Sequence, residues 1–135
     1  MTDGTSDSPW KLFTPPGSSA YEMFRTVKDG KAVLTCVVGT TTLYYDARAI
    51  DDLYEMLKTH GDWMELGGSD EQKDANPGSV EAWARSPENP IGGWYGLRKG
   101  YRGRFAVYVP PLLERLGLAE LTHNAKSNLM RAKPK

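Results

Sequence analysis

The stretch AYEMFRTVKDGKAVLTCVV, residues 20–38, decides the fold because it predicts two strands joined by a two-residue turn. Asp29 and Gly30 stand between runs rich in β-branched and aromatic residues, and Asp-Gly suits a turn whose two central residues need a positive φ. Such a turn sets the cross-strand pairs Val27–Ala32, Arg25–Leu34, Met23–Cys36 and Tyr21–Val38. Because side chains alternate along a strand, one face of the hairpin should carry the core residues Tyr21, Met23, Leu34, Cys36 and Val38.

A third strand and a long helix follow the hairpin. Gly39-Thr40 turns the chain, and TTLYY (41–45) is typical of another antiparallel strand. Residues 46–60 predict a helix, with Asp46 as its N-cap and Gly61 as the left-handed residue that ends it. The apolar residues of this helix recur at helical spacing and form one stripe that should face the core: Ile50, Leu53, Tyr54 and Leu57.

The rest of the chain predicts shorter elements, and with them an α+β fold class. The expected architecture is an antiparallel meander packed on one main helix, with a mixed C-terminal part that ends in a β-hairpin. The short elements are a strand at 62–66, a helical turn at the capping box 69–72, a helix after Ser79, a strand at 105–109, a helix opened by Pro110-Pro111, and a hairpin formed by 118–123 and 129–133.

The length of the chain, 135 residues, is that of one domain. Residues 1–9 are rich in Ser, Asp and Gly and are expected to be disordered, which leaves a single α+β domain at 10–135; within it, Trp10 to Phe13 should form an arm that packs its aromatic residues on the domain. No run approaches the roughly 18 apolar residues of a membrane helix, and the acidic N-terminus lacks the features of a signal peptide. The lone cysteine, Cys36, forms no internal disulfide. The expected location is the cytoplasm, with no membrane partner.

Charge is divided unevenly along a chain whose net charge is zero. Residues 1–90 carry 8 Lys and Arg against 15 Asp and Glu, and residues 91–135 carry 9 against 2. One interpretation is that the two halves attract each other, within one fold or across a homodimer. The other is that the basic half binds an anionic partner such as a nucleic acid.

The stretch GGWYGLRKGYRGR (92–104) concentrates the basic character, since it holds five glycines, three aromatic residues and four cations. A polyanion-binding surface would use Arg98, Lys99, Arg102, Arg104, Lys126 and Arg131, and Trp94 and Tyr101 could stack on bases. The alternative interpretation is a packed helical segment whose cations face water. It rests on the helical spacing of Trp94, Leu97, Tyr101, Phe105 and Tyr108.

Catalytic and metal-binding patterns are weak in this sequence. His60, Asp62 and Glu65 match no standard metal motif, and the acids Asp51, Asp52 and Glu55 are expected on a solvated helix face. Cys36 should be a buried, inert thiol. We therefore predict no catalytic residue, no metal and no cofactor.

Two resemblances extend this interpretation. The C-terminal ~30 residues, in which a helix is followed by LGLAELTH, a polar turn and NLMRAK, resemble the last helix and wing of a winged-helix domain. Over most of its length the chain also resembles a family of small bacterial domains of unknown function; the likeness rests on TPPGSS (14–19), TLYYDARAIDDL (42–53), HGDWMELG (60–67), VEAWARSPENP (80–90) and GGWYGLRKGYRGRF (92–105). Neither resemblance supplies an activity, a ligand or a catalytic residue.

Three functions remain open at this point. The leading expectation is a small binding or interaction module, homodimeric if the acidic and basic halves meet between two copies. A nucleic-acid or other polyanion-binding domain is the first alternative, and a small enzyme with an unrecognised site is the second.

Overall fold

The computed structural model describes residues 3–134 and contains the expected hairpin. Strands β2 (Ala20–Lys28) and β3 (Lys31–Val38) pair antiparallel, and the turn between them has positive φ values of 53° at Asp29 and 77° at Gly30. Three predicted cross-strand pairs are confirmed: Val27–Ala32, Arg25–Leu34 and Met23–Cys36. The register therefore follows from the turn.

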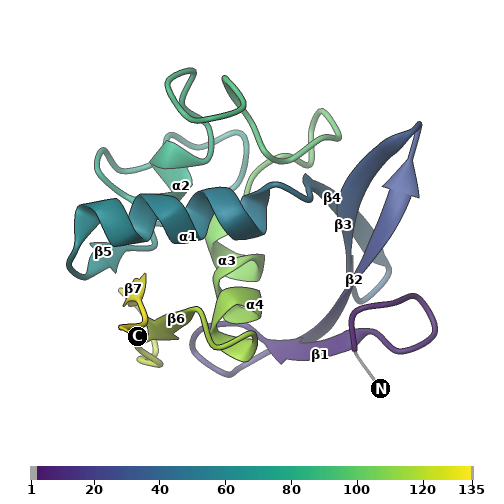
Figure 1. Ribbon diagram of the computed structural model, residues 1–135, viewed down its shortest axis with the longest axis horizontal. Coiled ribbons are helices and arrows are strands. Elements are labelled where there is room, and N and C mark those ends of the chain that lie inside the picture. The colour runs from purple at the N-terminus through teal and green to yellow at the C-terminus, as the bar shows by residue number, and fades with distance from the viewer. Residues whose placement is uncertain (1–2, 135) are drawn as a thin grey trace.

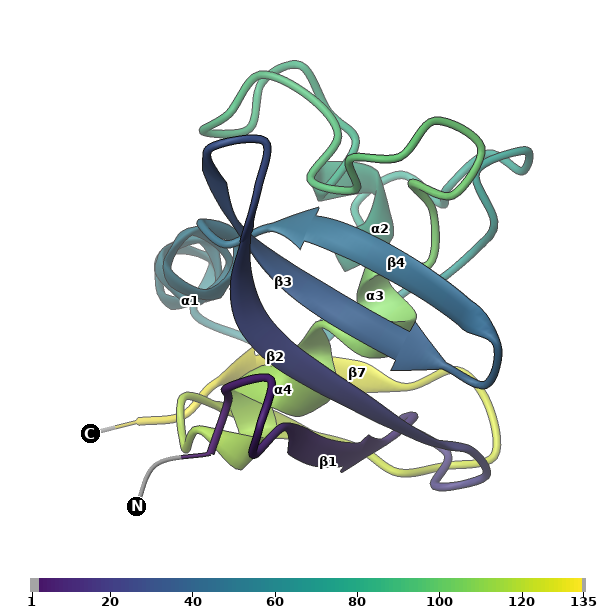
Figure 2. The ribbon, with the colours of Figure 1, turned by 90° about the vertical axis from the view of Figure 1, so that its right-hand side faces the viewer.

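The hairpin belongs to a four-stranded antiparallel sheet in the order β1-β2-β3-β4 (Figures 1 and 2). β4 (Thr41–Asp46) is the expected third strand, and β1 (Trp10–Phe13) pairs with β2 where only a packed N-terminal arm was expected. Trp10 is buried as expected, but Phe13 is 61% exposed, because side chains alternate along β1.

The N-terminal residues that precede β1 touch the sheet. The carbonyl of Gly4 accepts a hydrogen bond of 2.8 Å from the backbone N–H of Arg25, and Gly4 lies against the Trp10 ring so closely that a Cβ there would clash with it. The disorder predicted for residues 1–9 includes residues 1 and 2, which lie outside the described residues, and the division into a tail and a domain at 10–135 stays a prediction.

The main helix, α1 (Ala49–His60), begins three residues later than the sequence predicts. Asp46 is the last residue of β4 rather than the N-cap, although its carboxylate accepts the Arg48 N–H at 2.9 Å. Gly61 ends the helix in the left-handed conformation, as predicted, and its N–H donates to Leu57 O. The apolar stripe is confirmed for Ile50, Leu53 and Leu57, which are buried with Ala49; Tyr54 is half-buried.

The C-terminal part contains three short helices and a second small sheet. The helices are α2 (Val80–Trp83), α3 (Phe105–Tyr108) and α4 (Pro110–Arg115); the strands are β5 (Met64–Glu65), β6 (Ala119–Leu121) and β7 (Leu129–Ala132), in the order β5-β7-β6. The predicted final hairpin, the helix after Ser79 and the proline-opened helix are confirmed. The resemblance to a winged-helix wing stays a prediction.

Two local predictions are wrong. FAVYV (105–109) was expected as a strand, but residues 105–108 form a helix. Neighbouring residues of this segment are both buried, for example Phe105 and Ala106. A strand with one buried face would bury only every second residue. Within 69–72 the structure has one turn, at Glu71-Gln72, closed by a 3.1 Å hydrogen bond from the Lys73 N–H to Asp70 O, and no helix. The carbonyl of Ser69 accepts hydrogen bonds from the Arg85 side chain and from the Arg104 N–H instead.

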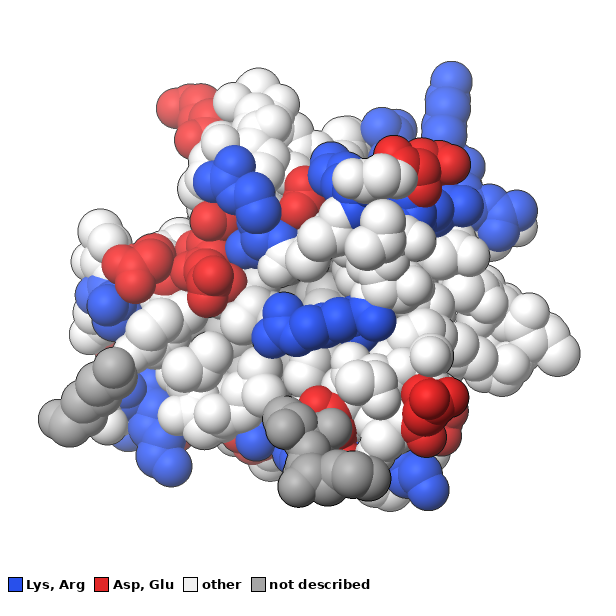
Figure 3. All heavy atoms as spheres, turned by 45° about the vertical axis from the view of Figure 1, so that its right-hand side comes forward, with Lys and Arg blue, Asp and Glu red and all other residues white. Residues whose placement is uncertain are grey.

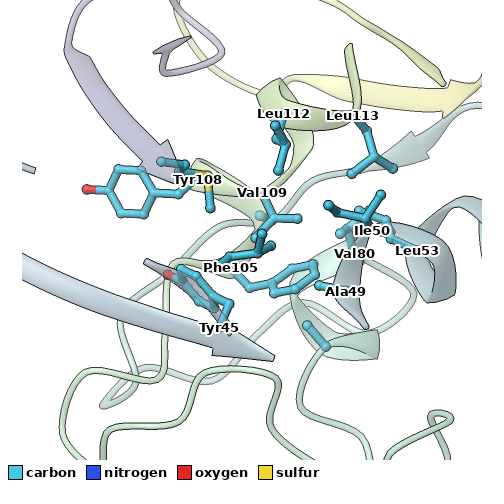
Figure 4. Packing of buried hydrophobic residues seen from close by; sticks show 14 of the residues in the cluster. Tyr45, Ala49, Ile50, Leu53, Val80, Phe105, Tyr108, Val109, Leu112 and Leu113 are labelled. Atoms are coloured by element: carbon cyan, nitrogen blue, oxygen red, sulfur yellow. The ribbon is translucent and has the colours of Figure 1, made fainter. Parts of the chain in front are cut away.

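The hydrophobic core lies between the inner face of the large sheet and the helices (Figure 1). Figure 4 shows Tyr45 from β4 beside Phe105 from α3, with Leu53 from α1 and Leu112 and Leu113 from α4 farther along the same cluster. Tyr45 and Phe105 meet edge to face with ring centres 5.8 Å apart. No helix within residues 3–134 has both the length and the apolar character needed to cross a membrane.

Candidate functional site

The predicted cations are split between paired and open positions. Arg102 pairs with Glu71 at 2.5 Å, Arg104 pairs with Asp70, and Arg131 pairs with Glu120 at 2.8 Å. Arg98, Lys99 and Lys126 are exposed. Arg131 also lies 4.5 Å from the centre of the Trp63 ring, beside the second sheet and apart from the glycine-rich stretch. The six cations therefore do not form one surface.

The predicted stacking residues differ from each other in accessibility. Trp94 is half-buried between the guanidinium groups of Arg85 and Arg102, which lie 4.7 and 4.4 Å from its ring centre. Tyr101 is 45% exposed, with Arg98 4.5 Å from its ring centre. The helical spacing of these aromatic residues does not correspond to a helix, since residues 92–104 form turns and bends. Gly96 shows why: a Cβ there would clash with the backbone of Arg102.

Arg85 organises the loop that faces this stretch. Its guanidinium donates to the backbone carbonyls of Ser69, Asp70 and Lys73 at 2.7 to 2.9 Å, and its Nε donates to Glu81 at 3.1 Å. The side chain of Arg85 is only 11% exposed and that of Glu81 is fully buried. A buried arginine that satisfies three carbonyls fixes the shape of a loop that has no ladder hydrogen bonds of its own.

Glu81 connects this loop to α3. Its Oε1 accepts the backbone N–H of Ala106 at 2.9 Å, while Oε2 faces Arg85. Burial raises the pKa of Glu81, and the hydrogen bonds from Ala106 and Arg85 oppose that rise. The pair joins α2 to the start of α3 and is part of the architecture.

A groove runs along the far side of the same loop. It consists of two adjoining hollows of about 400 and 730 Å³ that share Val38, Arg104 and Tyr108. The β3–β4 hairpin forms one wall, the loop at 67–76 forms the other, and α3 lies between them. The larger hollow extends to residues 14–19 and 125–128. Volumes of this size suit a small molecule or a short piece of peptide.

Arg104 lies at the centre of this groove on an unusual backbone. Its φ of 62° is in the left-handed region, which residues with a Cβ adopt at a cost of about 1 kcal/mol. Its N–H donates to Ser69 O at 2.8 Å, and its side chain remains 52% exposed while its Nε bonds to Asp70. The fold therefore holds a guanidinium at the groove in a conformation that glycine would adopt more easily.

The acids near Arg104 are held in their ionised form. The hydrogen bond from Arg104 lowers the pKa of Asp70, and the hydrogen bond from Arg102 lowers the pKa of Glu71. Glu71 also accepts the Gly100 N–H at 2.8 Å. The same bond to Asp70 raises the pKa of Arg104 further above its ordinary value. All these groups keep their charge across the neutral range.

The acidic and basic halves of the chain meet partly within the molecule. Among the described residues three ion pairs join residues 1–90 to residues 91–135: Arg102–Glu71, Arg104–Asp70 and Arg115–Asp3. On the face drawn in Figure 3, basic and acidic side chains are interspersed, most densely along the upper edge. The charge division along the sequence is therefore not a division into two faces in this view.

Two of the other residues that the sequence analysis considered as catalytic or metal-binding candidates lie in the core or bond to another part of the fold. Cys36 is buried on the core face of β3, and burial raises the pKa of its thiol, as expected of an inert cysteine. Asp52 accepts a 2.7 Å hydrogen bond from the Tyr95 hydroxyl, so this acid is not simply solvated. Across residues 3–134 there is no cluster of three metal-ligating side chains.

Sequence reasoning missed the residues that shape the groove. The sequence pattern does not group four residues that contact one another or the same loop: Arg85, Glu81, Asp70 and Glu71. Their contacts span up to 34 residues along the chain, and several are made to the backbone. One signal was present: a charged Glu-x-x-x-Arg pair in a segment otherwise apolar enough to be buried, VEAWAR.

Comparison with known proteins gives a family and no activity. The chain matches no curated protein and no solved structure. The model of a family of unknown function, DUF6855, matches residues 2–133, which is nearly the whole chain. This protein therefore belongs to the DUF6855 family of unknown function.

Proposed function

We propose that this domain is a binding module whose ligand lies in the groove and presents a carboxylate to Arg104. The observation that carries the proposal is an exposed arginine held at a φ of 62° where the two hollows of the groove meet. Strained backbone persists where the surrounding structure imposes it, and it is concentrated at functional sites.

The chemistry of the groove favours a carboxylate on an apolar body. Arg104 uses its Nε for Asp70, which leaves the outer edge of the planar guanidinium for a second acid. Val38, Leu43 and Val107 supply apolar surface beside it. A side chain or acyl group of the ligand would bury that surface while the carboxylate pairs with Arg104.

The charge states support binding over acid–base catalysis. A general acid or base works best when its pKa lies near the operating pH. The lowered pKa values of Asp70 and Glu71 move these groups away from that range. An enzyme would need another titratable group in the groove.

The homodimer and the nucleic-acid-binding domain remain alternative functions, and each predicts a different experimental result. Ion pairs within the chain already give Arg102 and Arg104 acidic partners, which lowers the charge available for a second copy or a polyanion. Sedimentation equilibrium tests the dimer, because it predicts a mass that rises with concentration. A continuous polyanion surface predicts binding of a nucleic acid that weakens when Arg131 is replaced, although this side chain does not line the groove.

The experiment is an NMR titration of the ¹⁵N-labelled chain with a panel of N-acetyl amino acids and their uncharged amides. We expect the acids, and not the matched amides, to shift the backbone resonances of Gly68, Arg104 and Val107. Arg104→Gln removes the charge, keeps a side chain on the same backbone and should abolish the response. Lys11→Gln is the control for charge alone, because it removes one positive charge from β1 and Lys11 does not line the groove.

Three results would each reject the carboxylate site. One is a panel in which no acid shifts these resonances, and another is an equal response to acids and amides. The third is an Arg104→Gln variant that responds as the wild type does.

A further inference from the structure

A second hollow lies at the tip of the β2–β3 hairpin, away from the groove. It has a volume of about 500 Å³ and is lined by Lys28, Asp29, Lys31, Tyr44, Leu97 and Arg98. Tyr44 precedes Tyr45 and follows Leu43, a groove residue, so alternation along β4 places Tyr44 on the opposite face of the sheet. The two sites therefore open on opposite faces of the sheet, and they come together where Arg98 packs on Tyr101, which lines the groove.

The cations of this hollow meet in spite of their repulsion. Lys28 and Lys31 are direct cross-strand partners on either side of the turn, where like charges destabilise a hairpin. The turn itself requires only the positive φ values of Asp29 and Gly30, so its geometry does not demand a cation at either position. The Asp46 carboxylate beside Lys31 and the Tyr44 ring beneath Lys28 offset this repulsion only in part, and a local rule broken in this way is typical of a functional site.

A third cation reaches the hollow from a distant part of the chain. Residues 95–97 run beside β4, with the Leu97 N–H bonded to Tyr44 O at 2.9 Å and Gly96 bridged to Tyr45. This pairing brings the exposed side chain of Arg98 to the hairpin tip. One of the four cations of the stretch at 92–104, Arg98, therefore lines the hollow at the hairpin tip rather than the groove.

The acids near these cations compensate them only in part. Asp46 pairs with Lys31 at 3.0 Å. Lys28 lies 4.6 Å from the centre of the Tyr44 ring, and Arg98 lies over Tyr101; within the described part of the chain neither forms an ion pair. Asp29 also lines the hollow, so three cations face two acids, Asp29 and Asp46, and one positive charge remains over an aromatic and aliphatic floor made by Tyr44 and Leu97.

We propose that this hollow binds a phosphate-bearing anion through Lys28, Lys31 and Arg98, with Tyr44 and Leu97 beneath the organic part of the ligand. Three cations on two segments suit either a terminal phosphate group that carries more than one negative charge or successive backbone phosphates that carry one negative charge each. The phosphate belongs either to a free phosphorylated small molecule or to the backbone of a single-stranded nucleic acid. This site does not depend on the carboxylate groove.

The test uses two probes on the ¹⁵N-labelled full chain, inorganic pyrophosphate and a short single-stranded thymidine oligonucleotide, at about 0.05 M ionic strength to limit screening. We expect at least one probe to shift the backbone resonances of Asp29, Gly30 and Arg98. Lys28→Gln and Arg98→Gln should each weaken binding about fivefold, the upper range for one exposed charge pair. Neither change strips an acid of its partner, so both variants should fold.

Matched controls separate this site from general charge effects and from the groove. Lys11→Gln removes one positive charge from β1, which pairs with the other end of β2, and should leave the dissociation constant unchanged. Arg104→Gln should also leave it unchanged. Pyrophosphate binding identifies a free phosphorylated ligand, whereas binding of the oligonucleotide alone, with the same sensitivity to Lys28 and Arg98, identifies the nucleic-acid source. The proposal is overturned if neither probe binds, or if Lys11→Gln weakens binding as much as Lys28→Gln does.

Discussion

Two arginine–carboxylate pairs bind opposite sides of the loop at 67–76, and they differ in burial, in hydrogen bonding and in backbone conformation. Arg85 and Glu81 lie on the inner side, 11% and 0% exposed, and Arg85 adds bonds to three carbonyls. Arg104 and Asp70 lie on the groove side, 52% and 38% exposed, on a left-handed backbone. The inner pair stabilises the loop, whereas the outer pair leaves a charged edge open to a ligand.

Replacing Arg85 should cause the largest loss of stability. Arg85→Met leaves Glu81 buried without its partner and removes the hydrogen-bond donors of three backbone carbonyls, those of Ser69, Asp70 and Lys73. The free energy of unfolding should therefore fall by about 3–5 kcal/mol. Denaturant unfolding measures this change. Lys58→Met, which breaks the exposed pair between Lys58 and Glu55, should leave the free energy of unfolding almost unchanged and serves as the control.

The double variant sharpens this prediction. Adding Glu81→Gln to Arg85→Met removes the buried charge while an amide can still accept the Ala106 N–H, so part of the stability should return. Equal stability of Arg85→Met and Lys58→Met would contradict the assignment of Arg85 to the architecture.

Gly103 tests the contact on which both pairs depend. A Cβ at this position would clash with the backbone of Ser69, Asp70 and Glu71, so Gly103→Ala should destabilise the fold by about 1–3 kcal/mol through overpacking. Thermal unfolding gives the size of the effect. A variant as stable as the wild type would mean that the loop does not pack on Gly103.

His123 provides a third, weaker pair at the rim of the groove. It bonds to Glu114 and to the carbonyl of Pro15, and these bonds raise its pKa, the one to Glu114 most. Because the folded-state pKa is raised, the stabilisation is complete below about pH 6.5, the ordinary value, and is lost as the pH rises through the folded-state pKa.

The pH dependence of a His123→Gln variant checks this sign. It should be less stable than the wild type by under about 1 kcal/mol at about pH 5.5, since the pair is exposed, and the difference should shrink at alkaline pH. A difference that grows with pH would contradict the assigned cause.

The parts of the fold that the sequence predicts are those with local rules. The register of the hairpin follows from Asp29-Gly30, and the end of α1 follows from Gly61. The strand predicted at 105–109 fails because a short buried helix and a buried strand have the same run of apolar residues. Local patterns predict elements, but they do not predict which sides of an element are covered.

Only some features of the candidate site could be predicted from the sequence. Arg104 stands out by its place among glycines and cations, but its left-handed backbone and its pairing with Asp70 come from a loop 34 residues earlier. Trp94 could be identified as an aromatic residue in a basic stretch, whereas its position between Arg85 and Arg102 depends on tertiary packing. Long-range polar contacts carry no periodic signal along the chain.

The most direct test of the contrast between the two arginines is the unfolding free energy of Arg104→Gly. Glycine relieves the left-handed backbone, and the lost pair with Asp70 is exposed, so stability should stay unchanged or rise by up to about 1 kcal/mol. That result would separate Arg104 from the architecture and leave its side chain for a ligand. A loss of about 2 kcal/mol or more would contradict the account, because it would make Arg104 a structural residue like Arg85.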